Sequence, residues 1–349
     1  MYNTVMKKLI YYLFFLNFIQ FSLFADQNYA VVLQYHRFDE TKYPSTSIST
    51  ELFTQQIKYL VDNDYTVWPF TKVVQYLLQK KKLPNKTIAI TIDDAYKSIY
   101  TKAYPLLKQY KLPFTVFVNS APVVHESIYY LDWDEMREMG ENGAEYANHT
   151  YSHQYLVRDG IKNPKNYKKY VKKELEMCEA KTQKELGEKV CNNPKILAYP
   201  FGEYDIKLMR LVKSFGYIGV AQNSGPISTE SNFMALTRFP MSGGFGEMNQ
   251  FRLKINTLPL PIKNISKEDT LVNSLNNPPL LTLTLKKPLK NLQCFTADGK
   301  KIAMKWLNNT TVAIQAQTPL KYPRDHYTCT AHVQGDAWYW YSHLWVVLK

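Results

Sequence analysis

Two adjacent carboxylates are the first residues in this chain that could do chemistry. Asp93 and Asp94 directly follow Thr87–Ile92, an apolar and β-branched run (TIAITI) that predicts a buried strand. Two charged groups at the end of a buried strand are costly unless they bind something. A turn there could direct both into one pocket, where one Asp holds a metal ion and the other acts as a base. In the competing interpretation, Asp94 only caps a helix that begins near Ala95.

A pair of histidines could complete such a metal site. His149 and His153 lie four residues apart in HTYSH, so on a helix or in a comparable turn they can share one cation. Asp94 and the two histidines give three protein ligands with at least one open position, which is typical of a catalytic metal site. A metal there lowers the pKa of a bound water and polarises a carbonyl group. Taken alone, the pair could equally be surface or core histidines.

Two further segments could add catalytic groups. The turn Tyr199–Gly202 follows an apolar run, and a turn containing Pro, an aromatic residue and Gly can direct a backbone N–H into a pocket as an oxyanion donor. Most such turns have no role beyond the turn itself. His36 follows the strand-like run Ala30–Tyr35 and is well placed to be a general acid if the strand belongs to a barrel. Taken alone, His36 is better explained as a hydrogen-bonded core histidine.

The elements that must position these residues alternate between strand and helix from about residue 29 to residue 237. This alternation predicts parallel βα units, and about seven of them predict a βα barrel, complete or incomplete. The chemistry of such a barrel lies where its strands end. The predicted strands are 30–35, 87–92, 114–118, 144–147, 196–199 and 218–221, and the predicted helices are 53–61, 96–110, 132–139, one that starts at 163–164, and 205–215.

The pattern changes after about Phe251. Prolines mark a linker over residues 256–279, and strands and turns follow it. Asp298-Gly299 predicts a hairpin between LQCFTA and KKIAMKW, and Asn308-Asn309 predicts another turn. One strand face should carry Tyr327, Cys329, Ala331 and Val333. We therefore predict an α/β barrel domain over residues 26–255 and a small C-terminal β-sandwich over 280–349.

The N-terminus and the cysteines indicate export. Lys7 and Lys8 precede an apolar run that ends at Ala25, which predicts a secretory signal peptide over residues 1–25; an uncleaved membrane anchor is the alternative. A periplasmic or cell-envelope location follows. In an oxidising compartment, the sequence-local pairs Cys178–Cys191 and Cys294–Cys329 predict two disulfides, with four buried thiols as the alternative.

The formal net charge is +13. A positive surface favours an anionic partner, such as a cell-wall polymer or a membrane surface, unless it only reflects a lysine-rich proteome. Export argues against nucleic acid as that partner.

The combination of motifs is far more specific than its parts. TIDDAY, HTYSH and AYPFG, in this order after a first strand that ends in Tyr35-His36, resemble the polysaccharide deacetylase family, carbohydrate esterase family 4. The resemblance covers roughly residues 29–240. It is greatest for the branch that contains poly-N-acetylglucosamine deacetylases, whose catalytic histidine motif is permuted to the N-terminal strand, as His36 is. The segment LDWDEM (131–136), upstream of the histidine pair, also resembles that branch.

The resemblance implies a distorted barrel of the (β/α)7 type that removes acetyl groups from an N-acetylhexosamine polymer. It implies that Asp93 is the general base, that His36 protonates the leaving amine and that the Phe201 amide binds the oxyanion. A divalent metal, zinc, is expected on the ligand set formed by Asp94, His149 and His153.

The chain departs from the family pattern at Ala198, where many members carry an arginine that tunes the base. Arg238 in LTRFP is expected to supply that charge instead, and Tyr199 is also expected to lie just behind the reacting groups. The sequence leaves two alternative functions open. One is the deacetylation of peptidoglycan or another envelope glycan, and the other is a non-catalytic module that only binds glycan.

Overall fold

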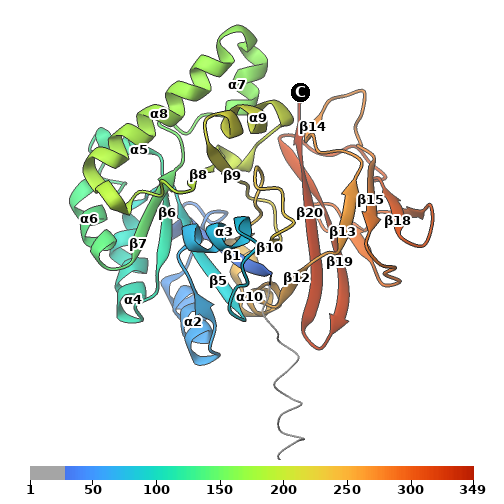
Figure 1. The fold of residues 1–349 in the computed structure, drawn as a ribbon, viewed down its shortest axis with the longest axis horizontal. Helices are drawn as coiled ribbons and strands as arrows, with labels where there is room; N and C mark the ends of the chain where they lie inside the picture. The colour runs from blue at the N-terminus through green and yellow to red at the C-terminus, as the bar shows by residue number, and fades with distance from the viewer. Residues whose placement is uncertain (1–27) are drawn as a thin grey trace, which may run out of the picture.

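A curled sheet of mostly parallel strands forms one half of the molecule, and two smaller sheets, one mixed and one antiparallel, form the other half (Figure 1). The computed structural model describes residues 28–349. The predicted signal peptide over residues 1–25 lies outside these residues. Among the described residues, no helix is both long and apolar enough to span a membrane.

The curled sheet has nine strands, of which seven follow the order β10-β1-β5-β6-β7-β8-β9, while β11 pairs with β1 and β4 pairs with β5. All of its strand pairs are parallel except β1–β10. The strands are β1 (Tyr29–Tyr35), β4 (Thr66–Val67), β5 (Thr87–Asp93), β6 (Phe114–Val118), β7 (Ala144–Asn148), β8 (Lys195–Ala198), β9 (Tyr217–Val220), β10 (Ile227–Ser228) and β11 (Phe239–Pro240). The short strands β2 (Arg37–Phe38) and β3 (Ser47–Ile48) pair separately.

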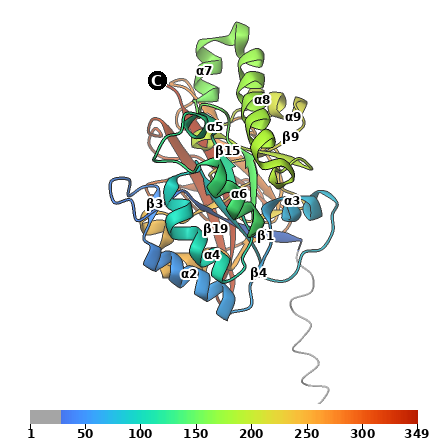
Figure 2. The ribbon, with the colours of Figure 1, turned by 90° about the vertical axis from the view of Figure 1, so that its left-hand side faces the viewer.

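Helices cover the outer face of the sheet (Figure 2), and one further helix packs against the residues that face its inside. The predicted helix over residues 96–110 begins only at Ile99, and the sequence pattern did not indicate α3, α5, α7 and α10. The helices are α2 (Thr50–Asp62), α3 (Phe70–Leu78), α4 (Tyr104–Gln109), α5 (Ser120–Val124), α6 (Trp133–Glu141), α7 (Leu156–Lys162), α8 (Tyr167–Leu186), α9 (Ile206–Ser214) and α10 (Met248–Ile255).

Alternation along the strands separates an outer core from an inner one. On β1, Val31 and Leu33 pack outward with α2, α4 and α6, whereas Val32 packs inward. The inner cluster collects residues from all the main strands and from α3, so α3 plugs the curled sheet. Both faces of strands such as β5 are therefore buried, which is why these strands are continuously apolar in sequence.

Residues 236–240 nearly close the curled sheet into a barrel. Leu236 bridges to Val220 of β9, and β11 then pairs with Leu33 and Gln34 of β1. This segment therefore joins the last barrel strand to the first. Arg238 lies within it and is completely buried, so its position is fixed by both neighbours.

The two C-terminal sheets pack around a separate hydrophobic core that includes Leu283, Val312 and Trp345. One sheet has the order β12-β20-β19-β16, with β14 beside β20, and the other has the order β13-β15-β18-β17. Their strands are β12 (Thr257–Pro259), β13 (Ile262–Ile265), β14 (Leu271–Val272), β15 (Leu281–Leu285), β16 (Gln293–Phe295), β17 (Met304–Trp306), β18 (Thr311–Ile314), β19 (Arg324–Gln334) and β20 (Ala337–Val347).

The stretch 256–279 is not the simple linker that its prolines predict. Three short strands, β12, β13 and β14, lie within it and pair with the C-terminal sheets. The prolines stand at the ends of these strands or outside them, where a missing backbone N–H costs little. The exact boundary between the two domains stays a prediction.

Two details of the predicted sandwich are wrong. The Asp298-Gly299 turn forms, but only a short bridge between Phe295 and Lys301 follows it, and β17 then joins the other sheet. Val333 is 39% exposed because the register of β19 against β20 shifts after His332. The shift ends the alternation that buries Tyr327, Cys329 and Ala331.

Of the two predicted disulfides, Cys294–Cys329 forms and Cys178–Cys191 does not. The thiol of Cys178 donates to the Val118 carbonyl on the outer side of the sheet, whereas Cys191 belongs to the inner cluster and accepts a hydrogen bond from Thr71. Closeness in sequence therefore does not bring the two sulfurs together, because the sheet lies between them.

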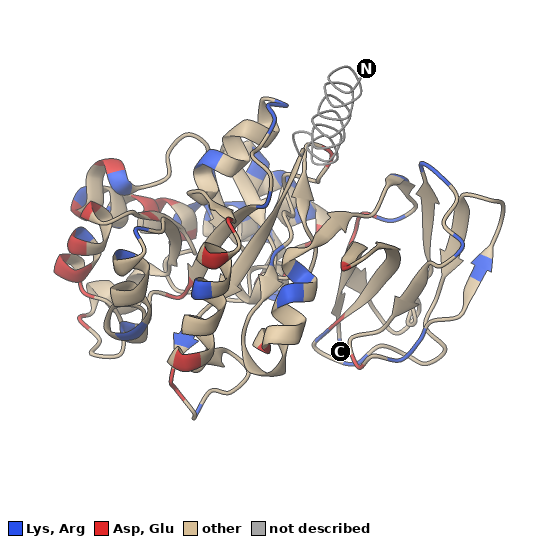
Figure 3. Ribbon diagram, turned by 90° about the horizontal axis from the view of Figure 1, so that it is seen from below, with Lys and Arg blue, Asp and Glu red and all other residues tan. Residues whose placement is uncertain are grey.

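Charged residues of both signs lie on the barrel helices, whereas those on the C-terminal sheets are mainly basic (Figure 3).

Candidate active site

The turn after β5 brings both carboxylates into one pocket. Asp94 and Ala95 both have positive φ, of 75° and 54°, and the Asp94 amide donates to the Phe117 carbonyl at 3.0 Å. Such a backbone is strained for residues other than glycine and is found mainly at functional sites. No helix begins at Ala95, since the first helical residue is Ile99, so Asp94 is not a helix cap.

The two histidines lie in a turn after β7 rather than on a helix. Thr150 and His153 have positive φ, and the Thr150 hydroxyl accepts a hydrogen bond from the His153 amide at 3.0 Å. The Nδ1 atom of His149 lies 2.8 Å from the Ala198 carbonyl, so we assign the proton to this nitrogen. In the neutral ring this tautomer leaves Nε2 of His149 without a proton and free to bind a metal.

The donor atoms of Asp94, His149 and His153 lie within 4.8 Å of one another. Oδ1 of Asp94 is 3.3 Å from Nε2 of each histidine. Neither Oδ1 of Asp94 nor Nε2 of His149 has a hydrogen-bond partner among the described residues, although both atoms are buried. These two buried and unmatched atoms face the same point, which is the position that a bound cation would occupy.

The charge states of the two rings suit such a cation. Burial lowers the pKa of His153 to about 4, so its ring is neutral at pH 7. Burial also acts to lower the pKa of His149, but the neighbouring Asp94 carboxylate outweighs it and raises that pKa; a bound cation displaces any proton held there. One carboxylate and two neutral imidazoles fit a divalent transition-metal ion, zinc included.

Asp93 is held by a different set of groups. Its two carboxylate oxygens accept hydrogen bonds of 2.6 and 2.8 Å from Arg238, and Gln34 donates a third, of 2.8 Å. Burial alone would raise the pKa of Asp93, but the nearby Arg238 and His36 hold that pKa below its ordinary value. Asp93 is therefore an oriented carboxylate at neutral pH.

Arg238 makes with Asp93 the charged contact that Ala198 cannot make. It comes from the closing segment 236–240, its guanidinium also donates to the Ala221 carbonyl and the Thr91 hydroxyl, and it lies over the Phe117 ring. The sequence predicts that Arg238 supplies the charge that is absent at Ala198, and Arg238 does contact Asp93 directly.

His36 lies at the end of β1 beside Asp93. Its Nε2 atom is 3.7 Å from an Asp93 oxygen, and its Nδ1 atom is buried without a hydrogen-bond partner among the described residues. Burial lowers the pKa of His36, although the two neighbouring carboxylates oppose that effect. Only the doubly protonated ring of His36 could protonate a leaving group, and the two neighbouring carboxylates favour that form.

The third motif supplies a turn whose two aromatic side chains diverge. Phe201 has φ of 58°, and its ring lies 4.5 Å from the His153 ring and stacks on Tyr155 at 3.7 Å. The structure therefore brings the Phe201 side chain next to the metal-ligand set. Tyr199 instead points into the outer core, where its hydroxyl donates to the Met234 carbonyl, so it does not lie behind the reacting groups as predicted.

The sequence pattern did not reveal two groups of residues near the site. Gln34, which holds Asp93, could have been found from the inward alternation of β1, because it lies two residues before His36. Arg37 lies between the rings of Tyr43 and Tyr96, with its guanidinium carbon 3.9 and 3.4 Å from their centroids. No local motif signals this cation–π cluster.

The C-terminal sheets also reach the site. Glu203, two residues after Phe201, is buried and bonded to Arg158 of α7 and, at 2.8 Å, to Arg324 of β19. Arg158 further donates to the Pro323 carbonyl at 2.8 Å. This network joins the turn that carries Phe201 to the C-terminal sheets.

Comparison with known proteins concerns the family and the fold of this chain. Residues 80–220 match the family model described as polysaccharide deacetylase, a range that holds all the motif residues except His36 and Arg238. A poly-beta-1,6-N-acetyl-D-glucosamine N-deacetylase of Staphylococcus aureus (strain MSSA476) is 28% identical over 238 residues, which are 62% of this chain and 80% of the relative.

Two solved structures show the same fold. The Streptococcus pyogenes deacetylase PplD, in complex with acetate, has a TM-score of 0.58 at 22% identity and covers 65% of this chain and 98% of its own. IcaB from Ammonifex degensii has a TM-score of 0.52 at 24% identity, and the match covers 61% of this chain and 91% of the IcaB chain. The C-terminal sheets are additional to this shared fold.

Proposed function

Since this chain carries a domain of the polysaccharide deacetylase family, and is thus a hydrolase that acts on amides, we propose that it removes N-acetyl groups from an N-acetylhexosamine polymer. The proposed substrate is an exopolysaccharide such as poly-N-acetylglucosamine, and the products are acetate and a free amine. One observation carries the proposal: the buried Asp93 carboxylate lies between an arginine and His36, next to a set of three potential metal ligands.

Asp93 is placed to take a proton from a water molecule as that water attacks the acetamide carbonyl. Arg238 and Gln34 fix the orientation of the carboxylate and keep it ionised before the reaction. His36, once it carries a second ring proton, is placed to give that proton to the nitrogen when the C–N bond breaks, so that the amine leaves neutral and His36 returns to its neutral form. The Phe201 amide would donate to the oxygen that becomes negative during the attack.

Asp94, His149 and His153 would hold a divalent cation, for which we propose zinc. Such an ion acts as a Lewis acid and lowers the pKa of water. The carboxyl group and the neutral imidazoles contribute one negative charge, so the site would keep a net positive charge opposite the developing oxyanion. Metal content measured before and after chelation, with zinc added back, tests this assignment.

The direct test is acetate release from defined N-acetylated glycans. The panel should compare oligomers of β-1,6-linked N-acetylglucosamine with peptidoglycan fragments, since these are the rival substrates. Asp93→Asn should retain its metal and lose at least about a thousandfold in rate, because the base is gone. Asp336→Asn makes the same chemical change on an exposed turn of the C-terminal sheets and is the matched control, with activity expected to be unchanged.

Full activity of Asp93→Asn would show that Asp93 is not the base. Acetate release from peptidoglycan fragments alone would replace the proposed substrate and leave the reaction unchanged. We also propose that the protein is exported and contacts anionic envelope components through its positive surface; fractionation of cells, with salt washing of the envelope fraction, tests both points.

A further inference from the structure

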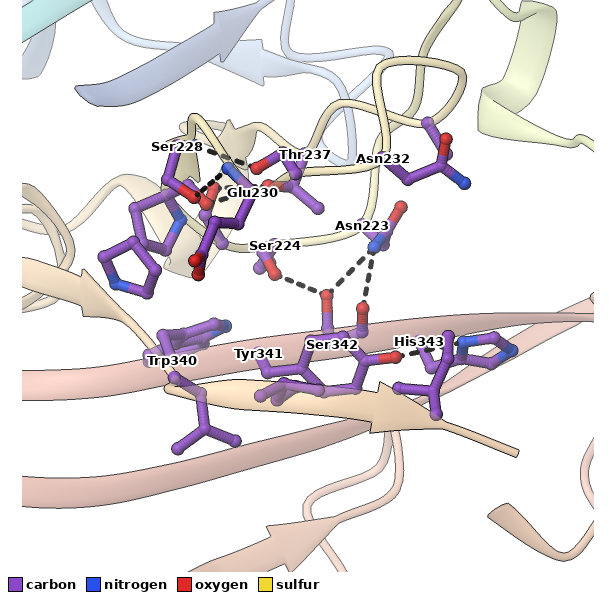
Figure 4. Close-up of a pocket in the computed structure, with 18 of the residues that line it drawn as sticks. Asn223, Ser224, Ser228, Glu230, Asn232, Thr237, Trp340, Tyr341, Ser342 and His343 are labelled. Atoms are coloured by element: carbon purple, nitrogen blue, oxygen red, sulfur yellow. Dashed lines mark hydrogen bonds between the residues drawn. The ribbon is translucent and has the colours of Figure 1, made fainter. Parts of the chain in front are cut away.

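A second hollow lies where the barrel meets the C-terminal sheets (Figure 4). It is a cavity of about 510 Å³, within the range of about 300–1,000 Å³ that is typical of small-molecule sites. Its walls are the loop 223–237, the segment 259–268 and residues 340–343 of β20. Among the described residues, none of the proposed catalytic or metal-binding groups lines it, so it is distinct from the candidate active site.

The lining favours a neutral ligand that both donates and accepts hydrogen bonds. Hydroxyl and amide side chains are the most numerous polar groups in it, and they lie beside apolar residues such as Leu260 and Ile262 and the indole of Trp340. Glu230 is paired with Lys286, and Lys263 is the only lysine or arginine among the lining residues, so there is no cationic cluster that would select a phosphate or a sulfate. The polar neutral residues include Asn223, Ser224, Ser228, Asn232, Thr237 and Ser342.

Hydrogen bonds across the cavity floor hold the barrel loop against β20. The Asn223 side-chain amide donates to the Ser342 carbonyl at 2.9 Å, and the Ser342 hydroxyl donates to the Ser224 carbonyl (Figure 4). The Thr237 hydroxyl donates to the Gly225 carbonyl at 2.8 Å. The walls are thus fixed before any ligand arrives, which reduces the entropy lost on binding.

Three polar atoms of the lining residues remain unmatched. Oδ1 of Asn223, Nε1 of Trp340 and Nε2 of His343 are buried and have no hydrogen-bond partner among the described residues. A buried donor or acceptor that lacks a partner destabilises the folded protein, because it has lost its bond to water without gaining another. The Asn223 oxygen is an acceptor, the Trp340 nitrogen is a donor, and the His343 nitrogen is either one according to its tautomer, so they suit a ligand that both donates and accepts, such as one with sugar hydroxyls or an acetamide group.

We propose that this cavity is a second carbohydrate-binding site, which holds part of the N-acetylated glycan while another part is processed at the barrel edge. The hydroxyl and amide lining sets the ligand class as a neutral sugar, and the identity of the glycan rests on the proposed function. Trp340 supplies an apolar ring, which suits the apolar face of a pyranose. Two sites on one chain raise the effective concentration of polymer at the active site.

The cavity and the active site share one segment of backbone. The Trp340 ring contacts the Phe239 ring edge-on at 5.3 Å, and the Arg238 amide donates to the Asn223 carbonyl at 3.1 Å. Arg238 is the residue that holds Asp93. The second site therefore lies next to the segment that carries Arg238, the residue that orients the proposed base.

The Trp340 indole N–H is a direct reporter for the test. The full chain is labelled with ¹⁵N-tryptophan and treated with chelator to stop turnover, and its indole resonances are followed as a β-1,6-linked N-acetylglucosamine tetramer is added. Trp340→Phe assigns the resonance. Asn264→Trp, from an exposed position on the cavity rim, should block the cavity, and Asn309→Trp, on an exposed turn outside it, is the matched control.

The expected result is a shift of the Trp340 resonance that saturates as the tetramer is added. The affinity obtained from this titration should fall at least tenfold in Asn264→Trp and stay unchanged in Asn309→Trp. Glu268→Trp, from another exposed rim position, replaces Asn264→Trp if that variant melts early. The proposal is overturned if the Trp340 resonance does not respond, or if it responds equally in the blocked variant. Acetate release from the metal-loaded preparations tests the proposed deacetylase function separately from the second binding site. Glycan binding without acetate release would refute only the proposed function.

Discussion

Removing the Arg238 guanidinium should destabilise the whole barrel. Arg238 and Asp93 are both completely buried and make two hydrogen bonds, of 2.6 and 2.8 Å. Loss of one partner of such a pair leaves an uncompensated buried charge and costs about 3–5 kcal/mol. Gln34 still donates to Asp93, so we expect Arg238→Met to fall at the lower end of this range.

A double-mutant cycle isolates the interaction. Asp93→Asn alone leaves the Arg238 charge buried without its partner and should also cost several kcal/mol. In the double variant neither charge remains, so the combined loss should be smaller than the sum of the single losses by at least about 2 kcal/mol.

The assay is urea unfolding followed by circular dichroism, with melting temperatures as a second measure. Arg238→Met should lower the melting temperature on the order of 10 °C. Arg252→Met changes an exposed arginine on α10 and should stay within about 0.5 kcal/mol of the unmodified protein. A loss below about 1 kcal/mol for Arg238→Met, or additive losses in the cycle, would refute the reasoning.

The same pair gives a pH dependence with a defined sign. Because Arg238 holds the pKa of Asp93 below its unfolded value of about 3.9, the stabilisation is present above that pH and is lost as the pH falls through the folded pKa. The difference in the free energy of unfolding between the unmodified protein and Arg238→Met should therefore become smaller as the pH falls below about 4. A constant difference down to about pH 2 would contradict the assigned charge state.

Three further predictions concern the metal, the disulfide and the C-terminal contact. Asp94→Asn should lose stoichiometric zinc by elemental analysis, whereas Asp93→Asn should keep it; equal loss in both would show that the ligand set is misassigned. Replacing Cys294 and Cys329 by serine should destabilise the C-terminal sheets by about 2–4 kcal/mol in urea unfolding, because a link across 35 residues restricts the unfolded chain; an unchanged midpoint would argue against this role. Arg324→Met should lower the free energy of unfolding by only about 1 kcal/mol, because Arg324 is partly exposed and Arg158 still pairs with Glu203. The same change should lower kcat/KM severalfold, because it loosens the turn at Phe201. Unchanged kinetics would show that the C-terminal sheets do not influence catalysis.

The sequence by itself determined the main strands of the barrel and the order of the chemical motifs. Runs such as Thr87–Ile92 are apolar because both faces of the strand are buried, and that property can be read locally. Asp93, Asp94 and His36 then follow from a general rule, since the functional residues of a parallel barrel gather at the carboxyl ends of its strands.

The contacts made through space were decided only by the tertiary structure. Arg238 meets Asp93 because the segment 236–240 closes the sheet between β9 and β1, and no local pattern predicts that closure. Cys178 and Cys191 are near each other in sequence, yet the sheet separates their sulfurs. Tyr199 follows β8 and points away from the site, because its side chain packs into the outer core and its hydroxyl donates to the Met234 carbonyl.

The second cavity shows the same division most clearly. Trp340 and Asn223 are more than a hundred positions apart in the sequence, and nothing in the residues around either one indicates that both line the same cavity. Local periodicity records which side of a strand is buried, whereas a cavity depends on how two separately folded sheets meet. The sequence therefore specifies the reacting groups of this protein, and the packing of its halves specifies what surrounds them.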